Sequence, residues 1–156
     1  MELSCQPMTK EKAVEILNWS YDPPYNLYNN EVSDMAIREF LNGTYEVIAN
    51  GNGDLIGFYC AGDGARVFAG ARVGAYTEDR VDVGFGMKPA LTGQGNGTTF
   101  CTFILDQVRE RHQGKPLRLT VATFNQRAIH LYEKLGFRKQ ISFYRDDVEF
   151  MTMIKD

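Results

Sequence analysis

The chain has 156 residues, 17 Lys and Arg against 20 Asp and Glu, and a formal net charge of −3. With 44% hydrophobic residues it can build a core, because a chain of this length buries roughly 70% of its unfolded surface, and general disorder is excluded. The mild acidity and the absence of any run of Lys or Arg argue against nucleic acid or an anionic membrane as the main partner. The length predicts a single domain over residues 1–156.

Cysteine content and the N-terminal residues bear on the cellular compartment. Cys5, Cys60 and Cys101 are odd in number and widely spaced, which is typical of a reducing compartment rather than of a disulfide framework. No Cys or His pair has the spacing of metal ligands, so no metal site is expected. Residues 1–6 lack the features of a signal peptide, and no apolar run approaches the ~20 residues that span a bilayer. We therefore expect a cytoplasmic protein, either a monomer or a homodimer.

The first part of the chain predicts helices followed by a hairpin. Apolar residues at helical spacing follow a Thr9 N-cap, and from Thr44 the hydrophobic period changes to two. The elements expected in order are a strand over 2–6, helices over 10–19 and 33–41, and strands over 45–49 and 55–60 that flank the turn residues 50–54. Between the two helices, residues 21–30 form a loop that contains two prolines and three tyrosines.

The second part predicts strands and helices in alternation. The Gly- and Ala-rich stretch 61–76 is hard to interpret, and a strand or a loop near Val67 is expected there. After it come a strand over 81–87, a turn over 89–96, a helix over 97–113, a strand over 117–124, a helix over 125–135, and strands over 137–145 and 148–154. Asn125 is the expected N-cap of the helix over 125–135.

The turn between the strand 81–87 and the helix 97–113 carries Gly93, Gly95 and Gly97 at alternate positions. A backbone without side chains at a helix N-terminus lets several N–H groups converge on a phosphate. The Walker spacing fails because no lysine lies between Lys88 and Lys115, and the dinucleotide fingerprint would need glycine at position 98. The loop is therefore an anion cradle of another kind or a tight turn.

Two segments together carry a family resemblance. The first is Thr92-Gly93-Gln94-Gly95-Asn96-Gly97, and the second is Asn125-Gln126-Arg127-Ala128-Ile129-His130-Leu131-Tyr132-Glu133-Lys134-Leu135-Gly136-Phe137. In them the chain resembles the GNAT superfamily of N-acetyltransferases, and the second segment is similar to the ribosomal-protein-alanine acetyltransferase branch. The resemblance implies an α/β fold with a mixed, mostly antiparallel sheet of about six to seven strands, flanked by about four helices and splayed at the central parallel strand pair. Thr92 departs from the family, whose loop usually begins with Arg or Gln.

The resemblance also implies a donor substrate, acetyl-CoA, bound mainly by backbone groups. The pyrophosphate would lie on the glycine loop, and the pantetheine arm would pair with the strand before it, where Gly84 and Gly86 fit a close approach. The residues assigned to the cofactor are Phe85, Met87, Leu91, Thr92, Gly93, Gln94, Gly95, Asn96, Gly97, Thr98 and Asn125. The oxyanion of the tetrahedral intermediate would fall to a backbone N–H near Met87.

Two side chains are candidates for proton transfer. Tyr132 is expected to protonate the departing thiolate, and Asp82 is expected to remove the proton of the amine, directly or through water. Glu78 and Asp79 are the alternative bases. Cys101 has no adjacent base, so a thiol nucleophile is not expected.

The acceptor pocket is expected between the first two helices. Its candidate residues are Tyr21, Asp22, Tyr25 and Tyr28, whose aromatic rings and carboxylate suit an ammonium group. The sequence thus predicts an acetyl-CoA-dependent N-acetyltransferase that acts on a small-molecule or peptide amine by direct attack in a ternary complex. The alternative is a non-catalytic acyl-CoA-binding or regulatory module on the same fold.

Overall fold

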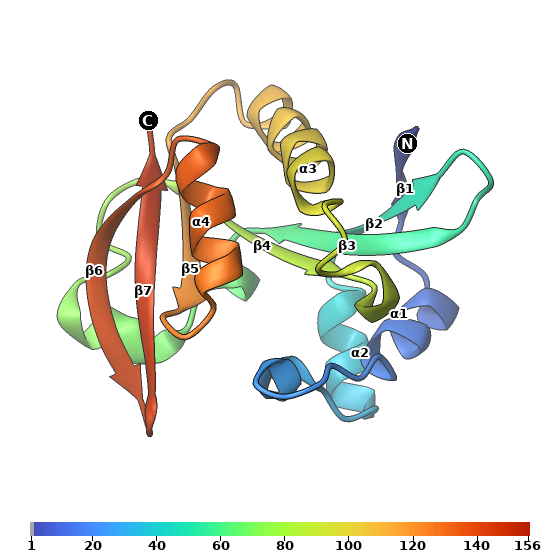
Figure 1. Cartoon of the computed structure of the whole chain (residues 1–156), viewed down its shortest axis with the longest axis horizontal. Coiled ribbons are helices and arrows are strands. Elements are labelled where there is room, and N and C mark those ends of the chain that lie inside the picture. Colours follow the sequence, from blue (N-terminus) through green and yellow to red (C-terminus); the bar gives the residue numbers. More distant parts are fainter. Residues whose placement is uncertain (1) are drawn as a thin grey trace. The chain divides into compact units, whose positions relative to one another are not determined.

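The computed structural model describes residues 2–156, which form seven strands, four α-helices and four 3₁₀ helices (Figure 1). The strand order is β1-β2-β3-β4-β5-β7-β6, and the β4–β5 pair is parallel. The described residues group into two compact units, which we call the N-terminal unit (residues 2–60 and 85–100) and the C-terminal unit (residues 61–84 and 101–156). The predicted fold class, an α/β protein with a mostly antiparallel sheet and one parallel pair, is confirmed.

The observed elements follow the predicted order, with ends that differ by one or two residues. The strands are β1 (Leu3–Pro7), β2 (Tyr45–Asn50), β3 (Leu55–Ala61), β4 (Val81–Met87), β5 (Leu117–Ala122), β6 (Arg138–Arg145) and β7 (Val148–Lys155). The α-helices are α1 (Lys10–Leu17), α2 (Asp34–Phe40), α3 (Gly97–Arg111) and α4 (Gln126–Lys134). The 3₁₀ helices are Tyr25–Tyr28, Asp63–Ala65, Phe68–Val73 and Pro89–Leu91. Of the two alternatives expected near Val67, the strand is wrong and the loop is correct: Arg66 and Val67 form a short loop between the 3₁₀ helices Asp63–Ala65 and Phe68–Val73, which the sequence did not predict.

Side chains at the helix starts explain where α1 and α2 begin in the N-terminal unit. The Thr9 hydroxyl accepts from the Lys12 amide at 3.2 Å, as predicted, and the Ser33 hydroxyl accepts from the Ala36 amide at 3.1 Å. Each cap satisfies one of the amide donors that a helix N-terminus leaves unpaired. Figure 1 shows α1 and α2 together on one side of β2 and β3.

An apolar cluster joins these two helices to the sheet of the N-terminal unit. Its buried members are Ala13, Ile16, Leu17, Phe40 and Val47. Phe58 of β3 packs at their edge, with its ring centroid 5.3 Å from that of Phe40. The hairpin β2–β3 predicted from the turn residues is confirmed, and the Gly53 amide donates to the Asn50 carbonyl at 3.0 Å.

One strand glycine is explained by packing within the same unit. A Cβ placed on Gly86 of β4 would overlap the ring of Phe58. A Cβ on Gly57 of β3 would likewise overlap the Gly86 carbonyl and the Phe100 ring. The close approach that the sequence predicts at Gly86 is therefore made by the side chain of Phe58.

The C-terminal unit is built on β5, β7 and β6, which pair antiparallel. The first two residues of β4 pair parallel to β5, with Val81 opposite Leu117 and Asp82 opposite Arg118. In Figure 1, α4 lies over β5. On β6 the ring of Phe143 packs against the 3₁₀ helix Phe68–Val73, so closely that a Cβ on Gly70 would lie 2.7 Å from it.

Candidate functional site

Three side chains brace the glycine loop from within. The Thr92 hydroxyl donates to the Pro89 carbonyl at 2.7 Å, the Gln94 amide donates to the Ala90 carbonyl at 2.7 Å, and the Asn96 amide donates to the Leu91 carbonyl at 3.2 Å. These three residues alternate with the three glycines, and their acceptors are three consecutive carbonyls. In this alternation, the three polar side chains stabilise the loop, and the three glycines lie between them.

The backbone amides of the same loop remain available to a ligand. Gly93 and Gly95 have φ of 71° and 80°, the left-handed region that glycine adopts most easily. A Cβ on Gly95 would meet nothing within 4 Å, so the side of the loop that it faces is open. None of the turn and loop hydrogen bonds between backbone groups of residues 2–156 is donated by an amide of residues 93–98. With the positive end of the α3 dipole beside them, these amides have the chemistry that suits an anion.

Thr92 is the position at which the loop departs from the family pattern, and its contacts show what the threonine does there. Its hydroxyl is already donated to the Pro89 carbonyl within the loop. A threonine here hydrogen-bonds to the backbone of its own loop.

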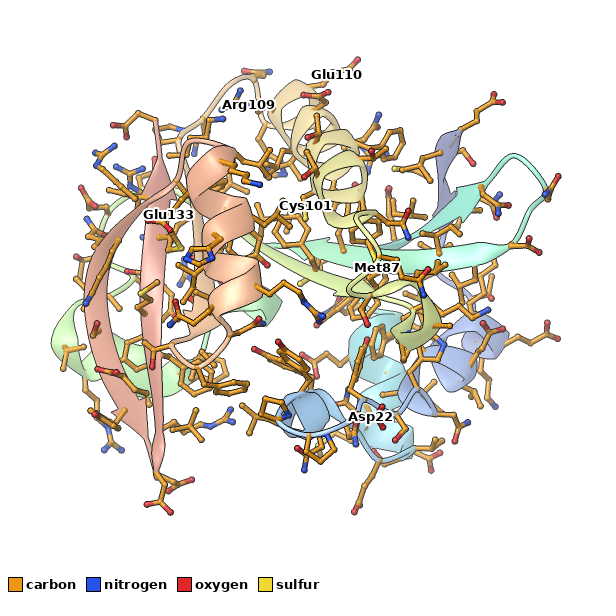
Figure 2. The ribbon with its side chains drawn as sticks, in the orientation of Figure 1. Asp22, Met87, Cys101, Arg109, Glu110 and Glu133 are labelled. Carbon is orange, nitrogen blue, oxygen red and sulfur yellow. The ribbon has the colours of Figure 1, made fainter. Side chains whose placement is uncertain are left out.

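The predicted acceptor residues lie in the N-terminal unit with the glycine loop. Tyr21 is partly buried, and its hydroxyl donates to the Met87 carbonyl of β4 at 2.7 Å. Burial raises the pKa of Tyr21 to about 12, so it stays a neutral donor. Tyr25 and Tyr28 open and close a 3₁₀ helix, and Asp22 is exposed just before it. Figure 2 shows Met87 at the end of β4 and Asp22 on the segment between α1 and that short helix.

Asp82 lies in the C-terminal unit, within a closed ion-pair network. It is 2% exposed, and Arg118, which is 0% exposed, donates to both of its oxygens at 2.6 and 2.8 Å. Arg66 donates to the second oxygen at 2.8 Å. This hydrogen bond is the main reason why the pKa of Arg66 is raised. Both oxygens of this buried carboxylate already accept from guanidinium groups, so the geometry argues against the base role expected from the sequence.

The sequence analysis missed the other members of this network. Tyr76 lies against both guanidinium groups, whose central carbons are 5.3 Å (Arg66) and 5.1 Å (Arg118) from its ring centroid. Its hydroxyl accepts from the Val67 amide at 2.9 Å and is 2.9 Å from the Thr120 hydroxyl. The signal available in the sequence was Arg118 itself, a charged residue inside the apolar strand β5.

The alternative bases are exposed and already paired. Glu78 accepts from Gln140 at 2.5 Å, and this hydrogen bond is the main cause of its lowered pKa. Asp79 pairs with Lys115 at 3.3 Å.

Tyr132 and Asn125 belong to α4 of the C-terminal unit. The Asn125 side chain accepts from the Ala128 amide at 3.2 Å, which confirms its role as N-cap. The Tyr132 ring is partly buried and packs edge-to-face on Phe137, with 6.3 Å between ring centroids. The glycine loop, Met87 and the acceptor tyrosines thus share one unit, and Asp82, Asn125 and Tyr132 share the other.

Comparison with known proteins decides the family. The family model described as acetyltransferase (GNAT) family matches residues 11–137. The chain belongs to this family. It is an acyltransferase, and it has the GNAT fold. A search of curated proteins finds no match.

Solved GNAT structures resemble the chain over nearly its whole length. A chimera of the Vibrio cholerae spermidine N-acetyltransferase SpeG and hSSAT has 18% identity and a TM-score of 0.74, covering 99% of this chain and 95% of that one. A GNAT-family acetyltransferase from Bacillus anthracis has 12% identity and a TM-score of 0.73, with the same two coverages of 99% and 95%. SpeG from Vibrio cholerae with manganese ions has 17% identity and a TM-score of 0.68, covering 99% and 92%. At these identities the likeness concerns the fold.

Residues 2–156 contain no group of three or more His, Cys, Asp or Glu side chains arranged to hold a metal ion. Within that same range no helix is long and apolar enough to cross a membrane.

Proposed function

We propose that this protein is an acetyl-CoA-dependent N-acetyltransferase that acetylates a primary amine by direct attack in a ternary complex. The observation that carries the proposal is the braced loop, in which no amide of residues 93–98 donates any of the turn and loop hydrogen bonds between backbone groups of residues 2–156. Together with the α3 N-terminus these amides suit the diphosphate of coenzyme A. The acceptor is a small-molecule amine or a protein N-terminus, including an N-terminal alanine as the resemblance of residues 125–137 suggests.

Each part of the donor has candidate residues on the chain. The amides from Leu91 to Thr98 would hold the pyrophosphate, and the backbone of Phe85 and Met87 would pair with the pantetheine arm. Asn125 would add a polar contact beyond its N-cap role. Bound acetyl-CoA supplies the acetyl thioester that the amine attacks.

The reaction requires two proton transfers. An N–C bond forms, the C–S bond breaks, the attacking amine gives up a proton, and the thiolate gains one. Tyr132 donates its hydroxyl proton to the thiolate, and a backbone N–H near Met87 stabilises the oxyanion. Because both Asp82 oxygens accept from arginines, we assign the removal of the amine proton to water instead.

Direct attack is favoured over an acyl-enzyme because of the state of Cys101. Its thiol is buried, and burial raises its pKa to about 12. The thiolate is the nucleophilic form of cysteine. At neutral pH Cys101 is therefore protonated and is not the nucleophile of an acyl-enzyme, which is consistent with the proposed direct transfer.

The test is release of free thiol from acetyl-CoA in the presence of single amines: putrescine, spermidine, lysine, and a peptide that begins with alanine. Turnover with one of them is the expected result. Binding of acetyl-CoA without turnover on any amine would favour the non-catalytic acyl-CoA-binding module.

Tyr132→Phe tests the proposed acid. It removes one hydroxyl and keeps the ring against Phe137, so stability should change by less than about 1.5 kcal/mol. We expect kcat to fall by about 10²–10⁴-fold, the range for a positioned acid, with acetyl-CoA affinity retained. Tyr144→Phe is the matched control, because Tyr144 is 64% exposed on β6. Equal kcat values in the two variants would exclude Tyr132 from the mechanism.

A further inference from the structure

Tyr21 is held at both ends within the N-terminal unit. Its backbone amide donates to the Asn29 side chain at 2.7 Å, which closes the segment 21–29 on itself. Its hydroxyl donates to the Met87 carbonyl, 66 positions further along the chain, also at 2.7 Å. One side chain thus fixes the segment between α1 and α2 to the last residue of β4.

The edge of β4 that Tyr21 reaches can be identified from the strand alternation. The Lys88 amide donates to the Ile56 carbonyl of β3 at 2.8 Å, so the backbone groups of Lys88 face β3. Successive residues of a strand direct their backbone hydrogen-bonding groups to opposite sides. The carbonyl of Met87 therefore faces away from β3, on the edge to which the proposed function assigns the pantetheine arm and the oxyanion.

The hydroxyl of Tyr21 suits positioning rather than proton transfer. A phenol has one proton to donate, and Tyr21 donates it to Met87. Burial keeps that proton in place, because it raises the pKa of Tyr21 to about 12. Its hydroxyl hydrogen is therefore not the group that an acceptor amine meets.

The segment that Tyr21 anchors carries acidic and aromatic side chains, which suit a positively charged ligand. Asp22, next to the anchor, is exposed, and residues 20–37 include two further acids, Glu31 and Asp34, but no Lys or Arg. Tyr25 and Tyr28 add aromatic rings, which attract ammonium groups. Fixing this segment to β4 would set where a positively charged amine is held relative to the strand edge.

We propose that Tyr21 is the positioning residue of the acceptor side: its bond to the Met87 carbonyl places the segment 21–29, with Asp22, beside the strand edge that binds the thioester. This inference rests on the proposed N-acetyltransferase function. It assigns to Tyr21 an effect on the amine and none on the donor.

The test is Tyr21→Phe, assayed with the best amine of the panel above and with Tyr144→Phe as the matched control. Losing one hydrogen bond should raise the KM for the amine about five- to tenfold. The KM for acetyl-CoA and the affinity for coenzyme A should stay within twofold of wild type. Tyr144→Phe should change neither KM.

A second pair of variants tests the other end of the anchor and guards against a general loss of structure. Asn29→Leu removes the acceptor of the Tyr21 amide and should also raise the KM for the amine. Asn29→Asp keeps an acceptor oxygen and should not raise it. A purely structural role would raise both KM values together, or lower kcat alone.

The outcomes separate the two proposals. Wild-type turnover with an unchanged amine KM in Tyr21→Phe overturns the role of Tyr21 and leaves the N-acetyltransferase function standing. A rise in the KM for acetyl-CoA equal to that for the amine also overturns it. No turnover by the wild type on any amine of the panel overturns both proposals.

Discussion

The glycine loop and the Asp82 network treat polar groups in opposite ways. In the loop, the side chains of Thr92, Gln94 and Asn96 donate to neighbouring carbonyls, and no amide of residues 93–98 donates any of the turn and loop hydrogen bonds between backbone groups. In the network, every oxygen of the Asp82 carboxylate has a guanidinium partner and the carboxylate is buried. From this contrast we infer that the loop offers its amides to a ligand, whereas the buried ion pairs of Asp82 stabilise the fold.

The largest expected effect comes from removing the negative charge of Asp82 from its ion-pair network. Asp82→Asn removes the charge that compensates Arg118 and Arg66, and breaking a buried ion pair in this way costs about 3–5 kcal/mol. Urea unfolding should show this loss. Asp79→Asn, which removes an exposed charge paired with Lys115, should change stability by less than about 1 kcal/mol.

The same variant distinguishes structure from catalysis at Asp82. If Asp82 were the catalytic base, Asp82→Asn would keep its stability and lose most of its kcat. We expect the reverse: folded Asp82→Asn protein, stabilised by coenzyme A, should retain turnover within about tenfold of wild type.

The next largest effect is expected from alanine substitutions at two glycines that share the same backbone conformation. Gly95 and Gly114 have φ of 80° and 75°, and a Cβ on either would meet nothing within 4 Å. Alanine at either position should cost about 1–2 kcal/mol of stability, because L-residues are strained in this region. Only Gly95→Ala should lower the affinity for coenzyme A, by tenfold or more in a calorimetric titration, because its methyl group enters the face of the loop that the pyrophosphate approaches. Equal affinities in the two variants would mean that the loop is only a turn.

The smallest effect is expected from changing Thr92, one of the three side chains that brace the glycine loop. Thr92→Val replaces the hydroxyl by a methyl group of similar shape and removes the bond to the Pro89 carbonyl. A hydrogen bond of this kind contributes about 0.5–1.5 kcal/mol, and we expect a loss of that size in the binding free energy of coenzyme A. Thr92→Ser keeps the hydroxyl and should bind as wild type does. A Thr92→Val protein that binds as tightly as Thr92→Ser would show that the loop needs no brace at this position.

The sequence predicts the elements well wherever a local signal determines them. The bounds 81–87 of β4 are correct, because an alternating pattern ends there before Pro89, and the caps Thr9 and Asn125 are correct, because capping depends on residues three positions apart. The stretch 61–76 resists prediction because Gly and Ala residues carry no hydrophobic period. Its short helices are held by contacts such as that of Gly70 with Phe143, 73 positions away.

The candidate site is predicted less completely, for a related physical reason. The glycine loop is visible because its three glycines are close together in the chain. The pairing of Asp82 with Arg118 depends on the register of two strands 36 positions apart, and the bond of Tyr21 to Met87 spans 66 positions. Local patterns contain no information on such pairs, so the closed state of Asp82 could not be seen from the sequence. The roles of Tyr132 and Asn125 toward the donor remain predictions.

The central claim, that the braced loop binds the diphosphate of acetyl-CoA, is tested most directly by the melting temperature of the wild-type protein with different ligands. A ligand at about 100 times its Kd adds roughly 2.7 kcal/mol, and each kcal/mol raises Tm by about 2–4 °C at this chain length. We therefore expect saturating acetyl-CoA to raise Tm by several degrees, and S-acetylpantetheine, which lacks the diphosphate, to raise it far less. A melting curve unmoved by acetyl-CoA, but raised by NAD or ATP, would contradict the claim.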